Sequence, residues 1–283
     1  NPKIIMVSVS AYGQTGPYKH KTGFGRVAQA FGGLTYLAGF PDQPPVNPGS
    51  ATLADYSAGL FAAYSTMVAL EYRNKTGKGQ WIDISLYESI FRLLDSLAPT
   101  YDKFGIIRER IGTGTANAVP HNHYPTKDGK WVAIACTSDR IFFRLLRVMQ
   151  QEHISMEPNF RTGQARLENR EEVDDLVSAW TLTRNMGEIM ELLDGNGVPG
   201  SPIHSIEDIF QDPQFIARKS IVEVDDPVVG IVKTPGIVPR LSRSPGTVKT
   251  LGPRLGQDNL KVYCGILGYT QEHIEDLLSK GII

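Results

Sequence analysis

Residues 55–86 read DYSAGLFAAYSTMVALEYRNKTGKGQWIDISL, and this stretch contains a helix, a turn and a strand in that order. Residues 55–73 are apolar on nearly every side of a helical projection, which predicts a helix that is buried on most faces. The polar residues 74–80 have the composition of a turn, and residues 81–86 alternate as a strand does. The stretch therefore predicts a buried helix that leads directly into a sheet.

The residues on either side of this stretch continue the pattern. Residues 4–10 (IIMVSVS) predict a strand, and the glycines and proline that follow predict a loop. A helical pattern begins near Phe24 and breaks at Gly32-Gly33, and a further helix is predicted over residues 87–104. The order strand, helix, strand, helix indicates an α/β layer with some parallel pairing.

A second, smaller α/β unit is predicted over residues 112–205. Its first residues belong to a long polar segment that contains glycines (105–129), and the loop 112–123 in this segment has the character of either a linker or a lid over a site. The elements expected in and after this unit are a strand at 130–136, helices at 138–149, 169–180 and 185–194, a hairpin that turns at 225–230, and a terminal helix ended by Gly281.

Composition excludes several classes of protein. The 283 residues are 41% hydrophobic, which is enough for one or two ordinary cores. The formal net charge is -1, so nothing indicates binding to nucleic acid or to a membrane surface. No apolar run is long enough to span a bilayer. Cys136 and Cys264 are far apart in sequence, which is typical of two reduced thiols in a cytosolic protein.

The first residues suggest a chain that is part of something longer. A predicted core strand begins at Ile4, and neither an initiating Met nor a leader segment precedes it. We expect an upstream part that is absent from this sequence.

Asp55 is the main candidate for chemistry, and two interpretations of it carry equal weight at this stage. Asp is among the best residues for capping the start of a helix, and a helix begins here. The same place at the positive end of a helix dipole favours a negative charge. A carboxylate with little solvent around it can act as a covalent nucleophile toward an activated acyl group.

Other sequence signals are weak. The glycines near Tyr12 and Gly32 do not have the spacing of a dinucleotide-binding loop, and residues 75–80 lack the spacing of a phosphate loop. His121 and His123 have no third ligand at metal-binding spacing, so no metal site is predicted. A serine nucleophile elbow is also absent from the sequence.

Several short motifs occur together in one order along the chain. They are SVSAYGQTGPY (8–18), GF…VAQAFGGL (23–34), LADYSAGLFAAY (53–64), EYRNKTGKGQWIDISL (71–86), PTKDG (125–129) and GVPGSPI (197–203). In this order and spacing the chain resembles the family III CoA-transferases (the CaiB/BaiF group), which include carnitine and formyl-CoA transferases and α-methylacyl-CoA racemase.

The resemblance implies an architecture. It implies an α/β protein with a Rossmann-like large domain, formed by residues 1–105 and 206–283, and with a linker and small α/β domain at 106–205. It also implies an interlocked homodimer, and an upstream segment that carries much of the site for the CoA nucleotide. That upstream part could be a separate subunit, a cleaved piece or simply outside this chain. A cytoplasmic location is expected, with a mitochondrial or peroxisomal one if the upstream part carries a signal.

The resemblance also implies roles for named residues. Asp55 would attack an acyl-CoA thioester, form a mixed anhydride and then an aspartyl-CoA thioester. Tyr12 and Gln14 would line the acyl pocket, and the remaining assigned residues would lie near the pantetheine and phosphates of CoA: Lys21, Phe24 and Gln29. Coenzyme A would be a substrate, no cofactor would be permanently bound, and the partners would be an acyl-CoA and a carboxylic acid.

Two positions depart from other members of the family. The racemase branch carries a His where this chain has Phe24, and because a phenyl ring cannot move a proton, transfer of CoA is preferred over racemisation. Many members have an Asp where this chain has Gly25. The alternatives that stay open are an acyl-CoA racemase or epimerase, and a non-catalytic subunit that binds CoA esters.

Overall fold

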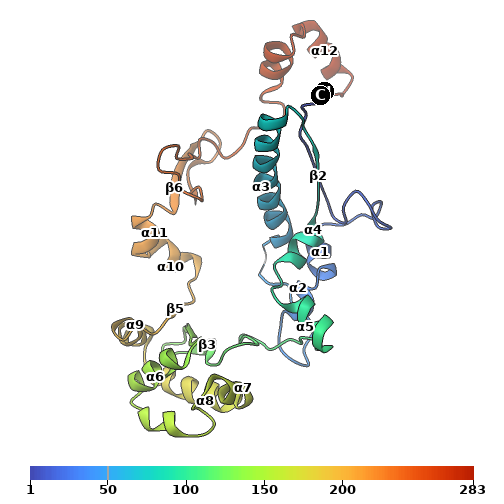
Figure 1. Ribbon diagram of the computed structural model, residues 1–283. Coiled ribbons are helices and arrows are strands. Elements are labelled where there is room, and N and C mark those ends of the chain that lie inside the picture. Colours follow the sequence, from blue (N-terminus) through green and yellow to red (C-terminus); the bar gives the residue numbers. More distant parts are fainter. Residues whose placement is uncertain (50) are drawn as a thin grey trace. The chain divides into compact units, whose positions relative to one another are not determined.

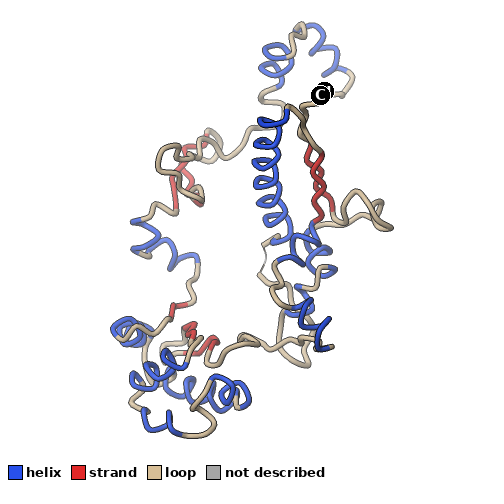
Figure 2. Tube along the Cα trace, in the orientation of Figure 1, coloured by secondary structure: helices blue, strands red, loops and turns tan. Residues whose placement is uncertain are grey.

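The computed structural model describes residues 1–49 and 51–283 and divides into two compact units, Asn1–Ile203 and His204–Ile283. Helices and strands of both units are labelled in Figure 1 and distinguished by colour in Figure 2. The first part of unit one contains β1 (Met6–Ser10), α1 (Gly25–Phe31), α2 (Leu34–Leu37), α3 (Leu53–Thr76), β2 (Trp81–Ser85), α4 (Leu86–Arg92) and α5 (Leu97–Phe104).

The strand–helix–strand–helix prediction is confirmed. Strands β1 and β2 pair in parallel, with Met6 opposite Trp81 and Ser10 opposite Ser85. Helix α3 makes the crossover between them and lies beside β2 in Figure 1. It ends at Gly77, whose left-handed conformation (φ 76°) lets its N–H donate to the carbonyl of Arg73.

The prediction that α3 is buried on most faces is wrong. Four large side chains on one face are exposed: Tyr56 (70%), Leu60 (74%), Tyr64 (69%) and Met67 (65%). These residues follow one another at intervals of three or four and therefore share one side of the helix. Helix α3 buries a strip of small residues against its neighbours β1, β2, α1 and α4, and the described residues leave the larger side chains uncovered.

The single helix predicted over residues 87–104 is divided in two. Helix α4 is capped by Ser85, whose side chain accepts a hydrogen bond from the N–H of Glu88. The helix stops at Arg92, and α5 begins at Leu97. Asp95, between them, has a positive φ (51°), which is incompatible with a continuous right-handed helix.

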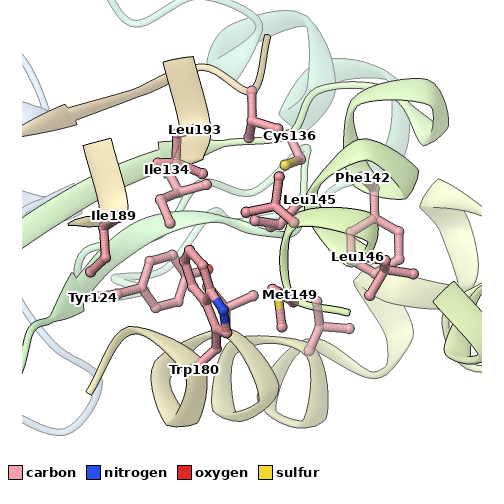
Figure 3. Close-up of a cluster of buried hydrophobic side chains, with 14 of the residues drawn as sticks. Tyr124, Ile134, Cys136, Phe142, Leu145, Leu146, Met149, Trp180, Ile189 and Leu193 are labelled. Atoms are coloured by element: carbon pink, nitrogen blue, oxygen red, sulfur yellow. The ribbon is translucent and has the colours of Figure 1, made fainter. Parts of the chain in front are cut away.

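The second part of unit one has its own sheet and core. The sheet is antiparallel in the order β3-β4-β5, and helices pack around it. Its elements are β3 (His121–Pro125), β4 (Trp131–Ala135), α6 (Asp139–Val148), a 3₁₀ helix (Glu152–Met156), α7 (Gly163–Glu168), α8 (Arg170–Thr181), α9 (Met186–Gly195) and β5 (Gly200–Pro202). Figure 3 shows the closely packed side chains of this core, which include Tyr124, Phe142, Leu145 and Leu193. The mixed α/β class is therefore confirmed in both parts of the unit.

Unit two consists of α10 (Ile206–Gln211), α11 (Pro213–Ala217), β6 (Ile221–Asp226), β7 (Gly230–Pro235), a π-helical stretch (Leu260–Ile266) and α12 (Gln271–Ser279). Strands β6 and β7 form the predicted hairpin, and α12 is the predicted terminal helix. The return of residues 206–283 to the large domain stays a prediction. Within the described ranges 1–49 and 51–283, the helices lack the length and apolarity that crossing a membrane requires.

Candidate active site

The loop that follows β1 is held in place by a residue of β2. Gly13 takes a positive φ (84°), which turns the chain sharply after the strand. The next N–H, of Gln14, donates to both carboxylate oxygens of Asp83, at 2.9 and 3.1 Å. Because the acceptor is charged, these are stronger than ordinary hydrogen bonds. Asp83 therefore fixes the loop that carries Tyr12 and Gln14.

A short glycine-containing segment lies between this loop and the start of α3. A Cβ atom built on Gly23 would lie 2.8 Å from Cβ of Ala11 and 3.3 Å from Cε2 of Tyr12. A Cβ atom built on Gly25 would overlap Oδ2 of Asp55 and lie 3.2 Å from its Cγ. The segment thus brings the loop after β1 and the carboxylate of Asp55 into one small region.

Asp55 is not the capping residue that local rules favour. Thr52 occupies the N-cap position, and Asp55 is the third residue of α3, in its first turn. The helix starts earlier than predicted because the N–H groups of both Asp55 and Tyr56 donate to the carbonyl of Thr52. The side chain of Asp55 is exposed, and over residues 1–49 and 51–283 it makes no hydrogen bond or ion pair. Its carboxylate is therefore available to a ligand.

Tyr12 belongs to a cluster of aromatic side chains from the loop after β1, α1 and α4. Its ring meets those of Phe31, Tyr18 and Tyr87 with centroid separations of 5.2, 5.8 and 6.3 Å, mostly edge to face. Such edge-on contacts add to the stability gained from burying the rings. Tyr12 is half-buried, whereas Gln14 is exposed beyond the loop's turn. Their contact with an acyl group stays a prediction.

Two of the three residues predicted near CoA are exposed. The ammonium group of Lys21 lies 3.6 Å from the centroid of the Tyr18 ring, a cation–π contact. Phe24 is the N-cap residue of α1 and is 81% exposed, although its neighbour Gly25 is buried against Asp55. Both side chains are free to meet a ligand, and their predicted roles remain predictions.

Gln29, the third, has a different environment. It is 1% exposed, and its side-chain amide donates to Oδ1 of Asn47 at 2.8 Å. The amide of Asn47 donates in turn to the carbonyl of Gly49 at 2.7 Å. These two bonds anchor the loop that precedes α3. We therefore interpret Gln29 as a residue that holds this loop, while the contact with CoA predicted for it stays untested.

The segment predicted as linker or lid is tied at several points. Gly112 donates its N–H to the carbonyl of Gly39 at 2.9 Å, and Arg170 donates to the carbonyl of Thr115 at 2.7 Å.

His121 and His123 line a cavity of about 310 Å³ beside this segment, together with Thr113. Within residues 1–49 and 51–283, no group of three His, Cys, Asp or Glu side chains is arranged to hold a metal ion.

The buried titratable groups of unit one lie in the second core rather than beside Asp55. Burial raises the pKa of the Cys136 thiol to about 12, so this thiol stays neutral and is a poor nucleophile at ordinary pH. Burial, reinforced by the nearby Asp174, raises the pKa of Tyr124 far above its usual value. Both cysteines are free thiols, as the sequence predicts. Asp55 is the better candidate nucleophile.

Sequence reasoning missed two residues that shape the site, Asn47 and Asp83, and it noted Gly25 only as a departure from other family members. Asp83 lies 69 residues from the N–H that it accepts, and nothing local marks it as different from any polar residue in an alternating strand. The prediction of some parallel pairing did not name the two strands; the pairing of β1 with β2 is the signal that could have placed Asp83 beside the loop after β1.

Comparison with known proteins gives a consistent result. Residues 1–259 match the model of CoA-transferase family III. The chain is 44% identical, over its whole length, to the alpha subunit of a succinyl-CoA–L-malate CoA-transferase of Chloroflexus aurantiacus and covers 66% of that protein. It is 32% identical to the mouse succinyl-CoA:glutarate CoA-transferase, of which it covers 64%. The chain thus spans about two thirds of the length of the curated relatives that it matches.

A solved structure agrees with the sequence relationship. A CaiB/BaiF family protein from Brucella suis is 29% identical and superimposes with a TM-score of 0.78, over 94% of this chain and 68% of that one. The match to the family model covers residues 1–259 and therefore includes the loop after β1, the segment 23–25 and the first turn of α3. The chain belongs to CoA-transferase family III.

Proposed function

We propose that this chain carries the nucleophile of a CoA-transferase and that the nucleophile is the carboxylate of Asp55. The observation that carries the proposal is the position of this carboxylate, exposed in the first turn of α3, against the backbone of Gly25 and without a partner among the described residues. An unpartnered carboxylate at a helix start is oriented by the backbone and remains free to attack.

The proposed exchange proceeds through two kinds of acyl intermediate. A carboxylate oxygen of Asp55 attacks the thioester carbon of the donor, and the C–S bond breaks with its electron pair on the CoA thiolate. This step leaves a mixed anhydride between Asp55 and the donor acid. The thiolate then attacks the Asp55 carbonyl of the mixed anhydride, which releases the donor acid as a carboxylate. The acceptor carboxylate attacks this aspartyl-CoA thioester and again releases the thiolate. Finally the thiolate attacks the acceptor's carbonyl, which forms the new acyl-CoA and restores Asp55.

The substrates proposed are succinyl-CoA as donor and a small dicarboxylic acid as acceptor. The support is the activity for which the relatives are named, which pairs succinyl-CoA with L-malate, D-citramalate or glutarate. Free coenzyme A and acyl-CoA would be substrates of the reaction, so no permanently bound cofactor is invoked.

We propose that the protein works as a dimer and that the reaction takes place in the cytoplasm. Two relatives are named as the alpha and beta subunits of one transferase, at 44% and 42% identity to this chain. The exposed face of α3, with Tyr56, Leu60, Tyr64 and Met67, offers apolar surface for assembly. Light scattering of the purified protein tests the dimer, and a monomeric mass at working concentration would contradict it.

The decisive experiment replaces Asp55 in the full-length protein. Asp55→Asn keeps the size of the side chain but removes the nucleophile, so exchange of CoA between succinyl-CoA and a panel of dicarboxylates should fall by about 10⁴-fold or more. Asp102→Asn, an exposed acid in α5, is the matched control and should leave the rate unchanged. In the wild type supplied with succinyl-CoA, hydroxylamine should attack the activated carbonyl of Asp55 and release the donor acid or CoA, which leaves a hydroxamate on Asp55. Full exchange by Asp55→Asn, without deamidation back to Asp, would refute the mechanism.

The racemase alternative predicts a different product. Racemisation needs a proton donor and acceptor beside the α-carbon, and Phe24, next to the Asp55 contact residue Gly25, can supply neither. Incubating the protein with a 2-methylacyl-CoA in deuterium oxide, without an acceptor acid, should give no deuterium at the α-carbon. Deuterium incorporation would favour the racemase, whereas inactivity in both assays would favour a non-catalytic subunit.

A further inference from the structure

The first turn of α3 has the sequence of a capping box that is not formed. Thr52 is the N-cap residue and Asp55 is the third residue of the helix, a spacing at which each side chain can bond the backbone N–H of the other. Helix α10 forms such a box: the hydroxyl of Ser205 accepts the N–H of Asp208, and the carboxylate of Asp208 accepts the N–H of Ser205. Within the described chain, Thr52 and Asp55 make neither of these side-chain bonds.

The backbone of Thr52 explains why the box is not formed. N-cap residues usually have an extended backbone, as Ser205 does (ψ 172°), but Thr52 has a ψ of 71°. The carbonyl of Thr52 accepts the N–H of Asp55 at 3.1 Å, which is the N–H that its hydroxyl would accept in a capping box. The hydroxyl of Thr52 is therefore not needed as a cap, and it is exposed and has no hydrogen-bond partner over residues 1–49 and 51–283.

This hydroxyl lies beside the unpartnered carboxylate of Asp55. Side chains three residues apart in a helix are neighbours on one side of it. Both side chains also meet Gly25, because a Cβ atom built there would lie 3.5 Å from Cβ of Thr52 and would overlap Oδ2 of Asp55. Since the described residues leave the hydroxyl and the carboxylate unbonded to each other, the hydroxyl can donate to a group that Asp55 attacks.

We propose that the hydroxyl of Thr52 donates a hydrogen bond to the oxyanion that forms when Asp55 attacks the donor thioester. The inference rests on the nucleophilic role proposed for Asp55. The attack joins a carboxylate oxygen to the thioester carbon and moves an electron pair of the C=O bond onto its oxygen. That oxygen and the attacking oxygen are bonded to the same carbon, so a donor beside the carboxylate can reach it. The hydroxyl keeps its proton, and the hydrogen bond weakens when the C=O bond re-forms and the C–S bond breaks.

The kinetic test compares two variants of the full-length protein in single turnover, with enzyme in excess over succinyl-CoA and no acceptor acid. Thr52→Val keeps the shape of the side chain and removes the donor, so the maximal rate of succinate release should fall by about 10²-fold. The enzyme concentration that gives half of this rate should stay within about twofold, because the carbonyl oxygen becomes negative only after attack. Thr52→Ser restores the donor and should recover most of the rate.

Two kinetic results would overturn the inference. One is a wild-type maximal rate in Thr52→Val. The other is an equal loss in Thr52→Val and Thr52→Ser, which would show that the hydroxyl is not the group that matters. A loss that appears only in the half-maximal enzyme concentration would also contradict it, because it would assign Thr52 to substrate binding.

A stability measurement separates catalysis from capping. Thr162 is the N-cap residue of α7, and its hydroxyl accepts the N–H of Ala165 at 3.1 Å. Thr162→Val should therefore lower the Tm by about 2–4 °C and leave the rate of succinate release unchanged. Thr52→Val should lower the rate and leave the Tm unchanged, because its hydroxyl caps no N–H. An equal loss of Tm in both variants would overturn the inference, since it would make Thr52 an ordinary cap.

The two proposals fail in distinguishable ways. An inactive Asp55→Asn, together with a wild-type rate in Thr52→Val, would leave the nucleophile in place and remove only the proposed donor. Full release of succinate by Asp55→Asn would overturn the nucleophile, and with it the oxyanion to which Thr52 is proposed to donate.

Discussion

The two parts of unit one are built on different kinds of core. The core of residues 119–198 contains many large side chains that are wholly enclosed, among them Phe142, Leu145, Ile189 and Leu193, each at 0% exposure. The core around α3 is smaller and consists mainly of alanines and isoleucines, such as Ala54, Ala58 and Ile90. The candidate active site lies in the part with the smaller core.

The difference shows how stability and chemistry are separated in this chain. Large enclosed side chains supply most of the free energy of folding, and they fill space so completely that no ligand can enter. Around Asp55, small residues and glycines let backbone segments approach closely and leave polar groups at the surface. The part with the smaller core is the part that presents the candidate nucleophile at its surface.

The largest expected effect contrasts two leucines. Leu145→Ala, in the enclosed core, should lower the free energy of unfolding by about 2–5 kcal/mol, because it leaves a cavity. Leu60→Ala, on the exposed face of α3, should change it by less than about 0.5 kcal/mol in the monomer. Urea unfolding of both variants measures the contrast. A loss of similar size for Leu60→Ala in protein diluted to the monomer would break the comparison, whereas a loss that depends on protein concentration would agree with assembly through this face.

Removing the buried cation of Arg166 should lower the free energy of unfolding by nearly as much. Arg166 is 2% exposed and donates to the carbonyls of Val119 and Phe160, both at 3.0 Å, and to Asp139 at 2.8 Å. Arg166→Met removes the donors from two buried carbonyls, so the free energy of unfolding should fall by about 2–4 kcal/mol. Arg161→Met, at an exposed position just before α7, is the control and should lower the free energy of unfolding by less than about 0.5 kcal/mol.

Asp83 should affect the activity more than the stability. Removing its carboxylate frees the loop at Gln14, so Asp83→Ala should lower kcat/KM for CoA exchange by about tenfold. Asp83→Asn keeps one acceptor oxygen and should recover most of the rate. Steady-state kinetics of the two variants checks the order, and equal losses in both would show that the negative charge, rather than the hydrogen bond, is what matters.

The smallest effect is a dependence of stability on pH in the enclosed core. Burial raises the pKa of Cys136 from 9.0 to about 12, so at pH 9–12 the unfolded chain loses the thiol proton while the folded chain keeps it. Stability should therefore fall as pH rises through this range. Cys136→Ala should flatten the decline in urea midpoint above about pH 9, whereas Cys264→Ala, at a less buried thiol, should not. Identical slopes for all three proteins would contradict this.

The sequence by itself determined the order of helices and strands around the site and the choice of Asp55 as the candidate nucleophile, although not every helix boundary. The strand at residues 6–10, the long helix that follows Thr52 and the strand at 81–85 depend on local periodicity and on nearby glycines, which a single sequence displays directly. The motifs that surround Asp55 identify the family, and the comparisons confirm it.

Only the tertiary structure decided how the site is assembled. The hold of Asp83 on Gln14, the buried bond between Gln29 and Asn47, and the contact of Asp55 with Gly25 join residues that are 69, 18 and 30 positions apart in the sequence. Such contacts depend on which surfaces meet after folding, and local sequence patterns do not predict them. For the same reason the prediction that α3 is buried on most faces was wrong. Its apolar residues favour burial, but they do not show which surfaces pack against the helix.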